Sequence, residues 1–268
     1  LRAGLISIEP ATGFVKAWVG GTNFKHFAYD HVRQGKRQVG STIKPFVYST
    51  ALVMGVVKPC TKFESGTSFC VDIFGSAGNL INRWCPRGDI PSNATVASGL
   101  AASSNPVTVA VMAKMGGHSG PKNISKLLKD LEINLRPEDE GPSMCLGVMD
   151  LSLFQMVGAQ AMFVNQGIYV RPTTILRIED RNGNVIYSAD PHSKEVMNSG
   201  VAYTTLSMMK GVITGGTGSS LRSGRKWGGI THPTAGKTGT TQSNADGWFM
   251  GLTPELVTGV WVGAEDRA

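Results

Sequence analysis

Strand-like runs occupy both ends of the 268-residue chain, and the stretch between them has helical patterns. Residues 5–9 and 14–19 are rich in apolar and β-branched side chains and flank a turn-like Pro-Ala-Thr-Gly segment, which predicts a β-hairpin. Three further runs, 234–240, 245–252 and 256–262, predict an antiparallel meander. Strands at both termini with helices between them predict an α/β fold of the α+β type, in which helices flank a five-stranded antiparallel sheet joined from both ends.

The middle of the chain supplies the expected helices. Residues 46–54 are apolar at nearly every position and are followed by Gly55, a pattern that predicts a helix buried on all sides. Two shorter helical patterns, 95–102 and 107–115, flank an Asn-Pro pair. Further elements are expected at 120–131, at 150–167 with Asp150 as the cap, at 198–214, and at a hairpin centred on 181–184.

Residues 56–93 are irregular, with scattered Gly, Pro and Ser, and we expect a loop or small lobe there within a single domain spanning 1–268. No metal site is expected, because C-x-x-C spacing and suitably placed His partners are missing around the four cysteines, Cys60, Cys70, Cys85 and Cys145. One local disulfide between Cys70 and Cys85, formed in an oxidising compartment, and free buried thiols both fit this pattern.

The net charge of +7 is spread along the chain without a run of five like charges. A solvated basic surface explains this distribution better than a nucleic-acid site, because no aromatic-rich basic strand or helix-turn-helix pattern accompanies it. No stretch approaches 18 consecutive apolar residues, so we expect a soluble piece of protein. The absence of an initial Met suggests a fragment of a longer chain.

A Ser-x-x-Lys pattern on a helix places the lysine one turn beyond the serine, where its amine can take the proton of a hydroxyl nucleophile. Ser41 and Lys44 have this spacing, and Gly40 and Pro45 favour a close backbone approach at a helix start. The apolar helix that follows would keep Lys44 poorly solvated and favour its neutral form. The spacing alone is weak, since it recurs at three other serines, Ser119, Ser207 and Ser223.

A second pattern, Ser-x-Asn, occurs once, at residues 103–105. It interrupts two predicted helices, so Ser103 and Asn105 can project together from the turn between them. A hydroxyl in such a place can pass protons, and an amide can orient a peptide.

The third pattern is Lys237-Thr238-Gly239-Thr240, the only Lys-Thr-Gly sequence in the chain, and it lies on a predicted strand. Gly239 leaves room for a ligand to run beside the backbone. Lys237 supplies positive charge, and the hydroxyls of Thr238 and Thr240 can hold a carboxylate. The amide of Thr240 can pair with that of Ser41 to bind a developing oxyanion.

The three patterns, in this order, match a motif set of penicillin-binding proteins and class A β-lactamases. Residues 38–52, 101–106 and 235–254 resemble the transpeptidase domain of class A, bifunctional penicillin-binding proteins, and the likeness extends from the opening hairpin to the last strand. The resemblance implies the penicillin-binding/β-lactamase-like transpeptidase fold. Departures from the family pattern, at Val39 and Gly88, leave the three motifs intact.

The resemblance also implies an activity. The enzyme would be a peptidoglycan D,D-transpeptidase that cross-links stem peptides ending in D-Ala-D-Ala, uses no cofactor and is acylated by β-lactams. Its full-length form would be membrane-anchored, with an upstream glycosyltransferase domain, and would place this domain in the periplasm, at the extracytoplasmic face of the inner membrane. The implied roles are nucleophile for Ser41, general base for Lys44, proton shuttle for Ser103, substrate positioning for Asn105, and electrostatic and carboxylate binding for Lys237, Thr238, Gly239 and Thr240.

Three other activities share these motifs. A class A β-lactamase needs a glutamate to activate water, and the family's E-x-x-x-N pattern is missing from the sequence. A β-lactam sensor domain would use the same serine to bind drug and signal, and the gene upstream of this chain would distinguish it. A D,D-carboxypeptidase, which passes the acyl group to water, has the same motifs, so the motifs do not distinguish it from a transpeptidase.

Overall fold

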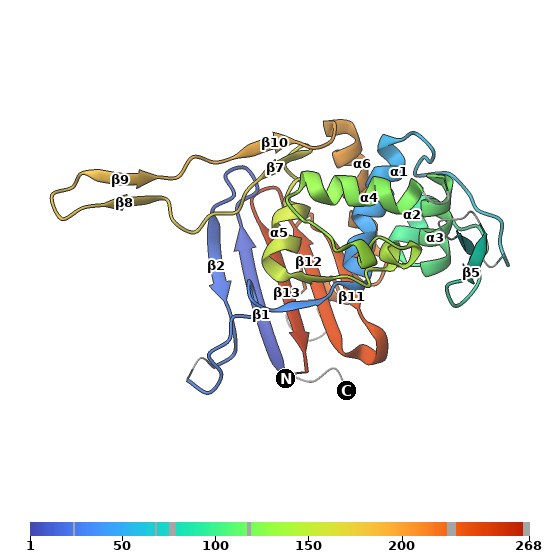
Figure 1. The fold of residues 1–268 in the computed structure, drawn as a ribbon, viewed down its shortest axis with the longest axis horizontal. Coiled ribbons are helices and arrows are strands. Elements are labelled where there is room, and N and C mark those ends of the chain that lie inside the picture. The colour runs from blue at the N-terminus through green and yellow to red at the C-terminus, as the bar shows by residue number, and fades with distance from the viewer. Residues whose placement is uncertain (24, 68, 75–78, 117–118, 224–228, 265–268) are drawn as a thin grey trace.

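The computed structural model describes residues 1–23, 25–67, 69–74, 79–116, 119–223 and 229–264. Its centre is a five-stranded antiparallel sheet in the order β11-β12-β13-β1-β2, which confirms the sheet expected from the two ends of the chain (Figure 1). The first and the last strands are therefore neighbours. The strands are β1 (Arg2–Ile8), β2 (Val15–Val19), β11 (Ala235–Thr240), β12 (Asp246–Leu252) and β13 (Val257–Gly263).

Burial alternates along β12 and β13, as expected for strands with one face on the core. Trp248 and Trp261 are paired neighbours on the buried face. The indole of Trp261 donates to the buried carboxylate of Asp246 at 2.9 Å, and that of Trp248 donates to the Gln38 carbonyl at 2.9 Å. These bonds satisfy the polar atoms of two large side chains, and the bond to Gln38 ties the sheet to the segment just before Ser41.

Helices cover this buried face. Helix α5 (Leu153–Ala161) packs on β1 and β13, and α6 (Ser199–Thr214) packs on β11. Helix α1 (Lys44–Val53) is buried from Lys44 to Ala51, which confirms the expected all-round burial except at the C-terminal end, where Val53 and Met54 are exposed. The other helices are α2 (Val96–Ala101), α3 (Asn105–Lys114) and α4 (Ser119–Asp130), with short 3₁₀ turns η1 (Gly40–Ile43), η2 (Pro137–Asp139), η3 (Pro142–Leu146), η4 (Ser219–Leu221) and η5 (Gln242–Asn244).

Both boundaries of the helix predicted at 150–167 are wrong, because α5 spans only Leu153–Ala161. Asp150 does not cap a helix over 150–167, because it opens the short strand β6 (Asp150–Ser152), which pairs with β3 (Lys36–Gln38). The cap is Ser152, whose hydroxyl accepts from the Gln155 amide at 3.2 Å while the Gln155 side chain accepts from the Ser152 amide at 3.0 Å. This reciprocal capping box fixes the start of α5 two residues later than a lone acidic cap would suggest.

The region 56–93 holds a small hairpin of β4 (Val71–Phe74) and β5 (Leu80–Trp84). A disulfide joins Cys70 to Cys85 at the base of this hairpin, so the disulfide alternative is correct for this pair. The two remaining cysteines are free thiols, Cys60 exposed and Cys145 buried.

A second hairpin, β8 (Arg177–Glu179) and β9 (Val185–Ser188), projects from the body of the molecule (Figure 1). It confirms the turn expected at 181–184, where the Asp180 carboxylate accepts from the Asn182 and Asn184 amides at 2.7 and 2.9 Å. The strands β7 (Ile168–Val170) and β10 (Ser193–Glu195) pair at its base. Among the described residues, no helix is long and apolar enough to cross a bilayer.

The contact between α5 and the sheet predicts a position that tolerates no side chain. A Cβ added at Gly259 would lie 2.2 Å from Val157 Cγ2 and 2.9 Å from Leu153 Cδ1, so Gly259→Ala should overpack this contact. We expect a loss of about 1–3 kcal/mol in the free energy of unfolding, measured by urea denaturation. The control is Gly247→Ala on the neighbouring strand, where the nearest atom would be 3.6 Å away. Equal stability of the two variants would contradict the close packing.

Candidate active site

Ser41 lies in η1, directly before α1, where two glycines let this turn pack against strand β11. Gly40 has a φ of +51°, and a Cβ there would lie 2.7 Å from the Thr240 carbonyl oxygen. A Cβ on Gly239 would lie 2.7 Å from Thr42 Cγ2. Both positions therefore need glycine, and their close approach places the backbone of Ser41 beside the end of β11.

The turn that carries Ser41 is also held from the opposite side. The Gly40 amide donates to the Gly147 carbonyl at 2.9 Å, and Gly147 itself has a φ of +79°. The buried Gln160 amide on α5 donates to the Thr42 carbonyl at 3.1 Å. Neither Gly147 nor Gln160 was identified from the sequence, because each lies more than 100 residues from η1 and belongs to no motif.

Lys44 occupies the first position of α1, and its side chain is fully buried. Its Nζ donates to the Ser103 carbonyl and to Asn105 Oδ1, both at 2.6 Å, and lies 3.4 Å from Ser103 Oγ. Its backbone is helical, with φ −55° and ψ −40°, although a following proline disfavours that region.

Lys237 reaches the same hydroxyl from the sheet. Its Nζ donates to Ser103 Oγ and to the Thr238 carbonyl, both at 2.9 Å. Ser103 has a φ of +56°, which a non-glycine residue seldom adopts, and the turn that holds it lies between α2 and α3. The three sequence patterns therefore meet in space, with Ser103 between the two lysines.

Burial controls the protonation of both lysines. Desolvation lowers the pKa of Lys44 to about 7, and a nearby Cys145 thiol acts weakly in the opposite direction. Desolvation also lowers the pKa of Lys237 to about 7, with the like charge of Lys44 as the second cause. A lysine in this range can change its protonation state near neutral pH, as acid–base chemistry requires.

The remaining residues of the site are more open. Ser41 is half-buried, and its hydroxyl has no hydrogen bond within the part of the chain that the structure describes. Thr240 is exposed, and Thr238 shares a 2.6 Å hydrogen bond with the hydroxyl of Thr217. Thr217 was missed from the sequence, although a hydroxyl residue inside a glycine-rich segment was a signal that it could approach a neighbouring strand.

The other Ser-x-x-Lys pairs lie in different surroundings. Ser119 and Ser207 are exposed, and so are the lysines that follow them, Lys122 and Lys210. Ser223 is exposed, and its lysine lies outside the described residues. In the described ranges no group of three or more His, Cys, Asp or Glu side chains could hold a metal ion.

Comparisons with known proteins point to one protein family. The sequence model described as "Penicillin binding protein transpeptidase domain" matches residues 4–264. Penicillin-binding protein 2D of Bacillus subtilis is 32% identical over 100% of this chain and 38% of its own length, and penicillin-binding protein 1A of Rickettsia prowazekii is 33% identical over 98% and 35%. The chain thus spans little more than a third of these relatives.

The fold agrees as well. The crystal structure of penicillin-binding protein 1A from Haemophilus influenzae superposes with a TM-score of 0.84 at 22% identity, covering 99% of this chain and 44% of the other. Penicillin-binding protein PonA1 from Mycobacterium tuberculosis gives 0.77 at 26% identity, with 99% and 70% covered. The chain belongs to the penicillin-binding protein transpeptidase domain family.

Proposed function

We propose that this chain is a serine-type D,D-transpeptidase domain that cross-links peptidoglycan stem peptides, with Ser41 as its nucleophile. The observation that carries the proposal is the convergence of two buried lysines on Ser103, while the turn that carries Ser41 packs against the end of β11. A serine needs a nearby base, and an amine with a pKa near 7 is suited to that task at neutral pH.

In the first half-reaction, Ser41 Oγ attacks the carbonyl carbon of the penultimate D-Ala of a donor peptide. The hydroxyl proton passes to the neutral amine of Lys44. As the C–N bond to the last D-Ala breaks, a proton reaches the leaving nitrogen through Ser103, which lies 3.4 Å from Lys44 Nζ and 2.9 Å from Lys237 Nζ. An acceptor amine then attacks the ester carbonyl, the new amide bond forms as the C–O bond to Ser41 breaks, and the proton lost by the amine returns to Ser41 Oγ.

The open residues hold the substrate in this scheme. The amides of Ser41 and Thr240 bind the oxyanion of the tetrahedral intermediate, and the close packing of Gly40 on Thr240 supports their pairing. Lys237, with Thr238, Gly239 and Thr240, receives the terminal carboxylate. Asn105 orients the peptide and also holds Lys44, whose amine donates to its side chain at 2.6 Å.

The same groups open β-lactams, because these drugs present a strained amide where the D-Ala-D-Ala bond would lie. PonA1, the relative from Mycobacterium tuberculosis, has been solved in complex with penicillin V. Persistence of the adduct separates the transpeptidase from a β-lactamase, since the E-x-x-x-N pattern that would activate water is missing from the sequence.

We also propose that residues 1–268 act as one domain of a longer, membrane-anchored protein with a glycosyltransferase domain, at the extracytoplasmic face of the inner membrane in the periplasm. Matching relatives about three times as long, several of them penicillin-binding proteins 1A, support this arrangement. The Cys70–Cys85 disulfide fits an oxidising compartment.

Penicillin should form a lasting adduct on Ser41. Intact-protein mass spectrometry after mixing is expected to show one added drug mass for each chain, and peptide mapping should place it on the peptide that contains Ser41. Ser41→Ala should abolish the adduct. The matched control substitutions at exposed serines, Ser119→Ala and Ser207→Ala, should leave it unchanged. An adduct on another serine would refute the site, and rapid decay with hydrolysed drug would instead indicate a hydrolase.

Lys237 should recognise a carboxylate. For a β-lactam with a free carboxylate and its methyl ester, Lys237→Ala should reduce the second-order acylation rate of the free acid more, by about 1.5–3 kcal/mol in activation free energy. The measurement is stopped-flow acylation with both forms, and Lys210→Ala, at an exposed lysine, is the control. Equal losses for acid and ester would indicate a structural lysine.

The acylation rate should depend on pH through Lys44. Because its pKa is lowered to about 7, its amine is mainly protonated at pH 6 and mainly neutral at pH 8, so the rate should rise with pH and level off. The rise should be roughly tenfold for each pH unit below the midpoint. Stopped-flow measurements between pH 5.5 and 9 with the methyl ester of a chromogenic cephalosporin test this, because the ester lacks the carboxylate that Lys237, whose pKa is also lowered to about 7, would bind. Tryptophan fluorescence is the check on folding. A flat profile would exclude Lys44 as the base.

A further inference from the structure

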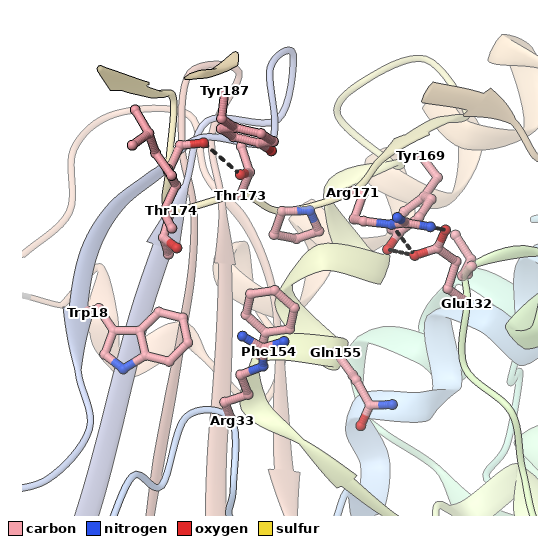
Figure 2. A pocket seen from close by; sticks show the side chains of 14 residues that line it. Trp18, Arg33, Glu132, Phe154, Gln155, Tyr169, Arg171, Thr173, Thr174 and Tyr187 are labelled. Atoms are coloured by element: carbon pink, nitrogen blue, oxygen red, sulfur yellow. Dashed lines mark hydrogen bonds and ion pairs between the residues drawn. The ribbon is translucent and has the colours of Figure 1, made fainter. Parts of the chain in front are cut away.

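A cavity of about 540 Å³ lies away from the catalytic groups, between strand β2, helix α5 and the projecting hairpin (Figure 2). Trp18 and Phe154 form part of its wall, with ring centroids 5.8 Å apart. Ile178 and Tyr187 line it from the hairpin, and each is 45% exposed. The cavity is therefore open, and its apolar wall lies beside charged and polar side chains.

Strand β2 beside this cavity is an outer strand of the central sheet. At its start, the side of β2 that faces away from β1 is covered, because the Val15 amide donates a hydrogen bond to the Thr173 carbonyl at 3.0 Å. Beyond that point, in the described part of the chain, residues 16–19 have backbone hydrogen bonds only to β1. An outer strand of this kind offers unpaired N–H and C=O groups to another extended chain.

A second hollow of about 470 Å³ continues along the same strand. It shares Trp18 with the first cavity and extends over Val19 and Gly20 to the rings of Phe27 and Tyr29. Two neighbouring hollows along one strand suit an extended chain, whose alternate side chains point to the same side.

Three charged side chains line the first cavity, and two of them, Arg171 and Glu132, form an ion pair with each other. Arg33 is exposed and lies over the Phe154 ring, with its guanidinium carbon 5.5 Å from the ring centroid. Among the described residues it has no ion pair. The Asp30 carboxylate lines the second hollow, where its Oδ1 accepts from Trp18 Nε1 and the Val32 amide at 3.2 and 2.9 Å, and it forms no ion pair with Arg33. The cavity therefore presents a cation to whatever enters it.

From these features we propose that the outer edge of β2 is a docking site for an extended segment of a partner polypeptide. The segment adds as a strand to β2, seats a large apolar side chain in the cavity beside Trp18 and Phe154, and places a carboxylate on Arg33. A polypeptide fits better than a glycan strand, because only a peptide backbone matches the unpaired N–H and C=O groups of the edge.

The projecting hairpin supports this assignment. Both of its strands are exposed throughout, although they carry four large apolar side chains, Ile178, Val185, Ile186 and Tyr187. A hairpin without a second layer is only marginally stable alone. A segment lying in the cavity would contact Ile178 and Tyr187 and cover one face of the hairpin.

The test uses a displayed library of random 12-residue peptides selected against the 268-residue chain. Enriched peptides should share a large apolar residue within three positions of Asp or Glu. For the best peptide, fluorescence anisotropy should show binding at least tenfold weaker to Trp18→Ala and to Arg33→Glu, and unchanged binding to Arg181→Glu, a matched charge reversal at the exposed tip of the same hairpin. Thermal unfolding checks that each variant is folded.

Two further arms give the proposal its specificity. A peptide with lysine in place of its acidic residue should bind Arg33→Glu better than the unchanged chain, and N-methylation of backbone amides should remove binding, since strand addition needs their N–H groups. Failure to enrich any peptide, or binding that is insensitive to both variants, would overturn the proposal. Binding of purified glycan strands that depends on Trp18 would also overturn it, because the surface would then take carbohydrate.

Discussion

The hydroxyl of Ser103 accepts hydrogen bonds from two buried lysines, and much of the surrounding structure serves to keep these three groups together. They come from α1, from the turn between α2 and α3, and from β11, which are far apart in the sequence. Two like charges in a poorly solvated place repel each other, so the elements that carry them must be held by other contacts. The apolar burial of α1 and the glycine contacts between η1 and β11 provide that restraint.

This arrangement lowers the stability of the folded state. Each lysine shifts from an ordinary pKa of 10.5 to about 7, and one pKa unit corresponds to about 1.4 kcal/mol. The resulting loss in the free energy of unfolding is present in full below pH 7. Between pH 7 and 10.5 the unfolded chain binds more protons than the folded chain, so the free energy of unfolding rises with pH and this loss is relieved. The capped helices and the aromatic contacts of the sheet offset a cost that the chemistry requires.

The sequence predicted the sheet, the buried helix α1 and the meeting of three motifs, because these depend on local periodicity and on recognisable residue patterns. The start of α5 was predicted wrongly, because Asp150 was taken as the cap, whereas Ser152 and Gln155 cap the helix reciprocally. Gln160 could not be identified, because its role arises only when distant segments pack, whereas the hydroxyl of Thr217 inside a glycine-rich segment was a signal in the sequence that was missed. The Cys70–Cys85 pair stayed open until the β4–β5 hairpin placed both cysteines side by side.

The neighbouring positions of β1 and β13 bear on how the protein is made. These strands pair along their whole length, and the hydroxyls of Ser7 and Thr258 meet at 2.6 Å across 251 residues. Contacts of such long range form slowly, and the ribosome delivers the second partner last. The segment with Ser41 and Lys44 therefore leaves the ribosome well before the strand with Lys237, and a nascent chain has an incomplete sheet and no assembled site. Chaperones that bind apolar segments would meet the chain in that unfinished state, while the apolar side chains of α1 are still uncovered.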